Sequence, residues 1–102
     1  MIFVIATAEL VEGRRAEFLA AFRANVPNVL AEDGCLEYTP TIDLPTDFAA
    51  QGAARNDVVT VVEKWRDLDA LQAHLVAPHM LKYREQVKEM VLGVELRILE
   101  PV

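Results

Sequence analysis

The segment VVTVVEKW at residues 58–65 constrains the fold more than any other part of this 102-residue chain. It is rich in β-branched residues and ends in tryptophan, a composition that favours a strand. Apart from Thr60, its first half is apolar on both faces, so both sides of the strand need cover. Side chains alternate along a strand, and one face therefore carries Val59, Val61, Glu63 and Trp65. The chain must build a sheet around this segment.

The segments before it supply two more strands and a helix. Residues 2–8 are an apolar strand, and apolar residues at helical spacing predict a helix at about 13–31. Pro27 is expected to bend that helix or disturb its last turn, and Gly34 is free to form a left-handed cap. Residues 35–43 predict a strand that contains Pro40. Proline has no N–H for a ladder, so this strand lies at a sheet edge or bulges at Pro40. Residues 44–56 indicate a long loop.

The segments after it supply two helices and a last strand. Asp67 is a suitable N-cap for a short helix, and Pro78 suits the first turn of another, which Gly93 is expected to end. Residues 94–99 form the closing strand. This order predicts a single α+β domain over residues 1–102, a ferredoxin-like split βαβ fold with an antiparallel sheet and helices on one face. The bare face needs an apolar partner, and we expect a homodimer with sheets packed face to face.

Charge and cysteine content exclude several classes of partner. The net charge is -6 and no basic block occurs, so nucleic acid is not an expected ligand. Cys35 is the only cysteine, which excludes an intrachain disulfide and suits a reducing cytoplasm. The apolar N-terminal run is too short for a signal core or a membrane span, so no membrane association is expected.

Residues 63–83, EKWRDLDALQAHLVAPHMLKY, bring together both histidines and the only tryptophan. Trp65 is either a core aromatic or a flat wall for an aromatic ligand. His74 lies beside an apolar helical stripe, where a structural histidine is common. His79 falls in the first turn after Pro78, which favours a neutral imidazole or a bound anion, although a solvated residue also fits. Tyr83 follows by four residues and is expected to face the same way.

A phenol one turn from an imidazole is suited to binding a hydroxylated ring and taking a proton from it. A core role for Tyr83 remains the alternative. Metal binding is not expected, because His74 and His79 are five residues apart with Pro78 between them, unlike a HExxH pair. A carboxylate from Glu63 could be added as a third ligand, but the poor geometry of the two histidines still argues against a metal site.

The strand end VVEKW, the helix DALQAHL, the turn APHM and the closing ELRILEPV resemble the antibiotic biosynthesis monooxygenase domain, most closely its bacterial quinol monooxygenase branch. The resemblance extends over essentially the whole chain. It implies a dimeric α/β barrel of ferredoxin-like subunits. It also implies oxidation of a small aromatic substrate, a quinol or polyphenol, by oxygen without a flavin, haem or metal cofactor.

By this resemblance His79 or His74 is the base, and Tyr83 and Tyr38 orient hydroxyls. Trp65 with Phe3 and Ile5 forms an apolar wall, and Glu63 belongs to the substrate-binding set.

The sequence departs from parts of the family pattern. Some members use an asparagine four residues before the tryptophan, where this chain has Val61, so that oxygen-orienting role does not transfer. Haem-degrading relatives have an asparagine on the first strand, near which this chain has Thr7. Two alternatives stay open, namely a non-oxidative isomerase of a small phosphorylated carbonyl metabolite and a ligand-binding module without turnover.

Overall fold

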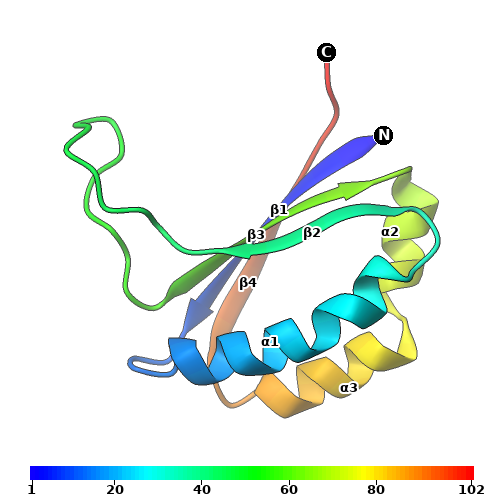
Figure 1. Cartoon of the computed structure of the whole chain (residues 1–102), viewed down its shortest axis with the longest axis horizontal. Helices are drawn as coiled ribbons and strands as arrows, with labels where there is room; N and C mark the ends of the chain where they lie inside the picture. Colours follow the sequence, from blue (N-terminus) through cyan, green and yellow to red (C-terminus); the bar gives the residue numbers. More distant parts are fainter.

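The computed structural model describes residues 1–102 as one four-stranded sheet with helices packed on one side (Figure 1). The elements in chain order are β1 (Ile2–Leu10), α1 (Arg15–Leu30), β2 (Cys35–Thr41), β3 (Val58–Trp65), α2 (Leu68–Leu75), α3 (Pro78–Val87) and β4 (Val91–Leu99). The strands are antiparallel in the order β2-β3-β1-β4. This is the ferredoxin-like α+β fold that the element order predicted. None of its helices is long and apolar enough to cross a membrane.

Strand register decides which side chains face the helices. Trp65 lies opposite Ile2, and Glu63 lies opposite Val4 on one side and Tyr38 on the other. Burial along β3 alternates strictly, with the helix-facing residues buried and the others half-buried. The predicted face of Val59, Val61, Glu63 and Trp65 is therefore confirmed, and it lies under the helix layer. The core sits between this face and the helices.

Pro40 lies inside strand β2 and Pro27 lies inside helix α1. β2 is an edge strand, and Pro40 pairs in register with Val61 while the register shift of β2 lies between Cys35 and Glu37. The edge explanation is thus confirmed and no bulge forms at Pro40. Helix α1 continues through Pro27 to Leu30, and the next N–H, that of Ala31, bonds the carbonyl of Pro27 at 3.2 Å.

Local capping signals are confirmed at three positions. Gly34 has a φ of +87°, which a side chain would disfavour. The carboxylate of Asp67 accepts a hydrogen bond from the N–H of Ala70 at 2.9 Å and so caps α2. Pro78 occupies the first position of α3. The last two signals fix the starts of the helices that carry the histidines.

The prediction that Gly93 ends the last helix is wrong. Helix α3 ends at Val87, and β4 already begins at Val91, so Gly93 lies inside the strand opposite Glu9. The pairing of Val91 with Leu10 extends the ladder beyond the predicted start of the strand. Tertiary pairing here overrides the local preference of glycine for a helix end.

The segment between β2 and β3 forms the long loop that the sequence predicted, although β2 ends at Thr41. An ion pair closes its base, with Nε of Arg55 at 2.7 Å from Oδ2 of Asp43. The arginine also lowers the pKa of the Asp43 carboxyl. The loop extends from the sheet on the side away from α2, as Figure 1 shows.

Candidate functional site

A cavity of about 470 Å³ lies between the sheet and the helix layer. Its floor includes Ala6 and Ala8 of β1 and Val61 of β3, and α1 contributes Phe18 and Phe22. The alanines are small residues at the centre of the sheet, so space remains above them. The volume falls within the usual range for small-molecule sites, and the predominantly apolar lining is typical of them.

The mouth of this cavity lies between α3 and β4. Here the lining residues are Arg84 and Lys88 from the helix and Val94 and Leu96 from the strand. Val94 is 62% exposed and Leu96 is 38% exposed, because the helices do not extend over β4. The mouth is therefore apolar on one side and basic on the other.

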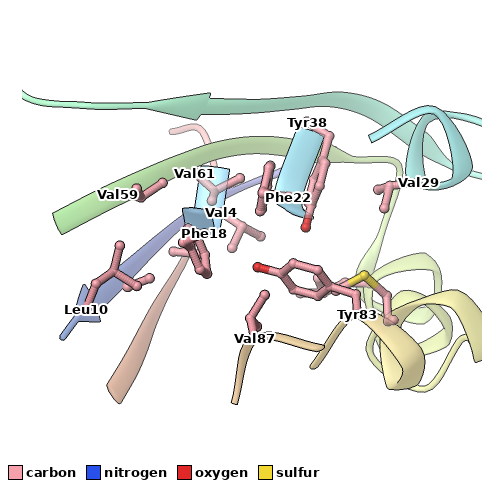
Figure 2. Close-up of a cluster of buried hydrophobic side chains, with 14 of the residues drawn as sticks. Val4, Leu10, Phe18, Phe22, Val29, Tyr38, Val59, Val61, Tyr83 and Val87 are labelled. Atoms are coloured by element: carbon pink, nitrogen blue, oxygen red, sulfur yellow. The ribbon is translucent and has the colours of Figure 1, made fainter. Parts of the chain in front are cut away.

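Two phenols project into the same space from opposite layers. Tyr38 on β2 stacks on Phe22 with ring centroids 5.2 Å apart, and Tyr83 on α3 meets Phe22 edge to face at 5.8 Å. Figure 2 shows both hydroxyl groups pointing toward the space between the sheet and α3. Burial raises the pKa of both phenols. The two groups therefore stay protonated and are available as hydrogen-bond donors.

Glu63 is a nearly buried carboxyl group that lines the cavity. Burial raises its pKa to about 7, although the hydrogen bond from Nε1 of Trp65 to Oε1, at 2.9 Å, works in the opposite direction. A carboxyl group with a pKa near neutrality is suited to exchanging protons with a ligand. Trp65 itself is fully buried behind this contact and supports Glu63 rather than lining the cavity.

His74 and His79 meet at one carboxylate. Nδ1 of His74 lies 2.8 Å from Oε2 of Glu32, and Nε2 of His79 lies 2.7 Å from the same oxygen. His74 is 3% exposed and lines the cavity, and its ring centroid lies 4.6 Å from that of Trp65. Burial lowers its pKa, and the Glu32 carboxylate partly opposes that effect.

The structure separates His79 from Tyr83, which the sequence placed on one helical face. Tyr83 points into the cavity, whereas His79 turns to Glu32 outside the cavity lining. Glu32 is a site residue that sequence reasoning missed, because no local motif marks it. No group of three or more His, Cys, Asp or Glu side chains in the chain is arranged to hold a metal ion.

Phe3 and Ile5 do not share a wall with Trp65, and this expectation needs correction. Phe3 pairs with Lys64 and Ile5 with Val62, so both lie on the open face of the sheet. Trp65 pairs with Ile2 on the helix face. Alternation along β1 places the two sets on opposite sides of the sheet. The amine of Lys64 instead covers the Phe3 ring at 5.6 Å.

The polar groups thus gather at the inner end of an apolar chamber. His74, Glu63 and Tyr38 come from three different elements, and Tyr83 completes the set from α3. Such an arrangement can orient a hydroxylated ring with donors and remove a proton from it, while apolar walls exclude water.

Comparison with known proteins identifies the family of this chain. The family model described as antibiotic biosynthesis monooxygenase matches residues 1–86. The chain belongs to this family. Among these monooxygenase relatives, the probable quinol monooxygenase YgiN of Escherichia coli is 39% identical over 103 residues, covering 99% of this chain and 98% of that protein.

Solved structures show the same fold. PA3566 from Pseudomonas aeruginosa is 25% identical with a TM-score of 0.80, covering 99% of this chain and 93% of that one. Rv0793 from Mycobacterium tuberculosis is 28% identical with a TM-score of 0.79, covering 99% and 94% respectively. Within this family the present chain has Val61 on the cavity floor, where some members use an asparagine, so no amide is present there.

Proposed function

We propose that this protein is a monooxygenase that oxidises a quinol or related polyphenol to a quinone with molecular oxygen. The supporting observation is that one apolar cavity holds two neutral phenols, a carboxyl group of raised pKa and an imidazole. Its relative YgiN carries the description of a probable quinol monooxygenase and aligns over nearly the full length of both chains. Family and cavity chemistry therefore favour the same class of substrate.

The substrate itself can supply the electrons in this reaction. Removing a proton from a ring hydroxyl gives an electron-rich phenolate, which passes electrons to oxygen more readily than the neutral phenol does. If one oxygen atom enters the ring, quinol and O₂ give hydroxyquinone and water. If none enters, they give quinone and hydrogen peroxide. In both cases the ring loses the electrons that oxygen gains.

We assign His74 as the base that receives the hydroxyl proton. It lines the cavity, whereas His79 does not, and the lowered pKa keeps its imidazole neutral and able to accept. The Tyr38 and Tyr83 hydroxyls hold the ring oxygens, and Glu63 is a second group able to exchange a proton with them. The ring then lies with its hydroxyls at the inner end and any apolar substituent toward the mouth.

Oxygen consumption tests this function. Purified protein, with its metal and chromophore content measured, is assayed with a panel of hydroquinones in an oxygen electrode. We expect uptake that stops under anaerobic conditions and that falls at least 100-fold in His74→Gln. Glu17→Gln, on the exposed side of α1, serves as the matched control. Turnover that is undiminished without oxygen would overturn the proposal.

A second candidate rests on the two cations at the cavity mouth. Arg84 and Lys88 are placed to bind a phosphate, which would suit a non-oxidative isomerase of a small phosphorylated carbonyl compound. This activity predicts turnover that is indifferent to oxygen and is lost in Lys88→Met. Saturable binding of a quinol with no turnover of either substrate would instead identify a ligand-binding module.

We also propose that the protein forms a homodimer through the open face of the sheet. Ile5 and Val62 lie there as a cross-strand pair with no helix above them. An identical sheet would cover these side chains and produce a dimeric α/β barrel. Light scattering should give twice the monomer mass, and Val62→Asp should shift it toward the monomer. A monomer mass for the unaltered protein would contradict this assembly.

We also propose that the protein is cytoplasmic. Its single cysteine, Cys35, is a half-buried free thiol, which suits a reducing compartment.

A further inference from the structure

The Glu32 carboxylate lies between two imidazoles from different helices. It follows α1 in a short turn, and its side chain is 12% exposed. Its Oε2 atom is 2.8 Å from Nδ1 of His74 and 2.7 Å from Nε2 of His79. A carboxylate oxygen only accepts hydrogen bonds, so each of these ring nitrogens donates. This contact fixes the tautomer of both rings.

For His74 the consequence is a proton acceptor directed at the cavity. With the proton on Nδ1, the neutral ring carries a lone pair on Nε2, and that atom has no hydrogen-bond partner in the chain. No buried side-chain nitrogen or oxygen in the protein lacks a partner, so Nε2 keeps accessible surface. Since the residue is almost completely buried and lines the cavity, that surface faces the cavity.

For His79 the consequence is a structural role. Its side chain is 26% exposed, and its ring lies outside the cavity lining. By donating to the same oxygen, it holds the Glu32 carboxylate in place against His74.

We propose that Glu32 is a positioning residue that makes His74 the base of the site, with His79 as the clamp that fixes Glu32. The inference rests on the proposed function. When a substrate hydroxyl gives its proton to Nε2, the O–H bond breaks, an N–H bond forms, and the ring becomes an imidazolium. The adjacent carboxylate stabilises that new charge, as the buried acid does in a Ser-His-Asp triad.

Other charged groups around His74 set the background for its titration. Arg84 on α3 disfavours the imidazolium, and His79 does so as well when charged. Glu63 on β3 shares the cavity, and Tyr38 on β2 packs edge to face at 5.4 Å. Glu32 is the only carboxylate that hydrogen-bonds the ring, so its removal should lower the pKa of His74.

Nuclear magnetic resonance tests the arrangement without any assay of turnover. In the unaltered protein, long-range ¹H–¹⁵N spectra should show His74 protonated on Nδ1 and unprotonated on Nε2. Glu32→Gln should weaken the tautomer preference and lower the pKa of His74, because the amide oxygen still accepts a hydrogen bond but carries no charge. A ring protonated on Nε2 in the unaltered protein would overturn the proposal by itself, even if the variant failed to fold.

Kinetics then test the role in catalysis. Glu32→Gln should reduce kcat by about 10- to 100-fold with little change in KM. The acidic limb of the pH profile of kcat should move to lower pH in this variant, because His74 has lost the neighbouring carboxylate charge that raised its pKa. His79→Gln should reduce kcat less and leave the His74 tautomer unchanged. Greater loss in His79→Gln than in His74→Gln would refute the assignment of roles. If the His74 tautomer is fixed but neither the unaltered protein nor any variant turns over a quinol, the proposed function is wrong and the positioning of His74 by Glu32 still holds.

Discussion

Replacement of Glu63 by glutamine should make the protein more stable at alkaline pH than the unaltered chain. The folded carboxyl has a pKa of about 7, raised by burial from its ordinary value near 4.5. The folded state therefore binds this proton more tightly than the unfolded state does. Its contribution to stability is complete below about pH 4.5 and is lost as the pH rises through about 7. Each tenfold difference in proton affinity is worth about 1.4 kcal/mol, so the loss amounts to at most about 3 kcal/mol.

The glutamine variant has no such titration, and its amide oxygen still accepts the Trp65 hydrogen bond. Urea unfolding followed by circular dichroism from pH 4.5 to 8.5, at one protein concentration, gives the free energy of unfolding for both proteins. The variant should gain up to about 3 kcal/mol on the unaltered protein across this range. Glu12→Gln, at an exposed turn, serves as the control, because it shows how much of the change in the free energy of unfolding comes from net charge alone. A difference between Glu63→Gln and the unaltered protein that stays constant across the range would refute the reasoning.

Three other substitutions, one of them with a matched control, test the geometry. Asp67→Ala removes the cap of α2 and should cost about 1 kcal/mol in urea unfolding, whereas no change would contradict the capping role. Gly34→Ala places a Cβ 2.6 Å from that of Ala70 at a φ of +87° and should cost at least about 2 kcal/mol. Gly13→Ala, at a φ of +80° with open space around it, should cost less, and equal losses would argue against the clash. Tyr38→Phe keeps the ring stacking and should raise KM for a hydroquinone about fivefold, the value of one hydrogen bond; an unchanged KM would remove that hydroxyl from the site.

The order of elements could be predicted from the chain because each depended on local rules. Pro40 indicated either an edge strand or a bulge, and Asp67 marked a helix start from its neighbours alone. The failure at Gly93 has a long-range cause, because strand pairing with β1 decides where β4 begins. Alternation indicates which residues of β1 share a face of the sheet. Only the strand register shows which of these faces carries Trp65, because it places Ile2, rather than Phe3, opposite that residue.

The candidate site was predictable in its residue types and not in its contacts. The sequence singled out both histidines but left open which of them is the base. Glu32 lies 42 and 47 residues from its two imidazole partners, and no local spacing links it to them. Only the packing of α3 against both α1 and α2 brings the three groups together.

The cavity occupies space that a chain of this size would otherwise fill with its own core. Ala6 and Ala8 leave that space open beneath Phe18 and Phe22. A larger aliphatic residue at Ala8 would bury more apolar surface, and in doing so it would fill the cavity that we propose as the substrate site. Thermal stability and ligand capacity therefore compete for the same atoms, and screening this protein for heat resistance alone would select variants that have closed their own binding chamber.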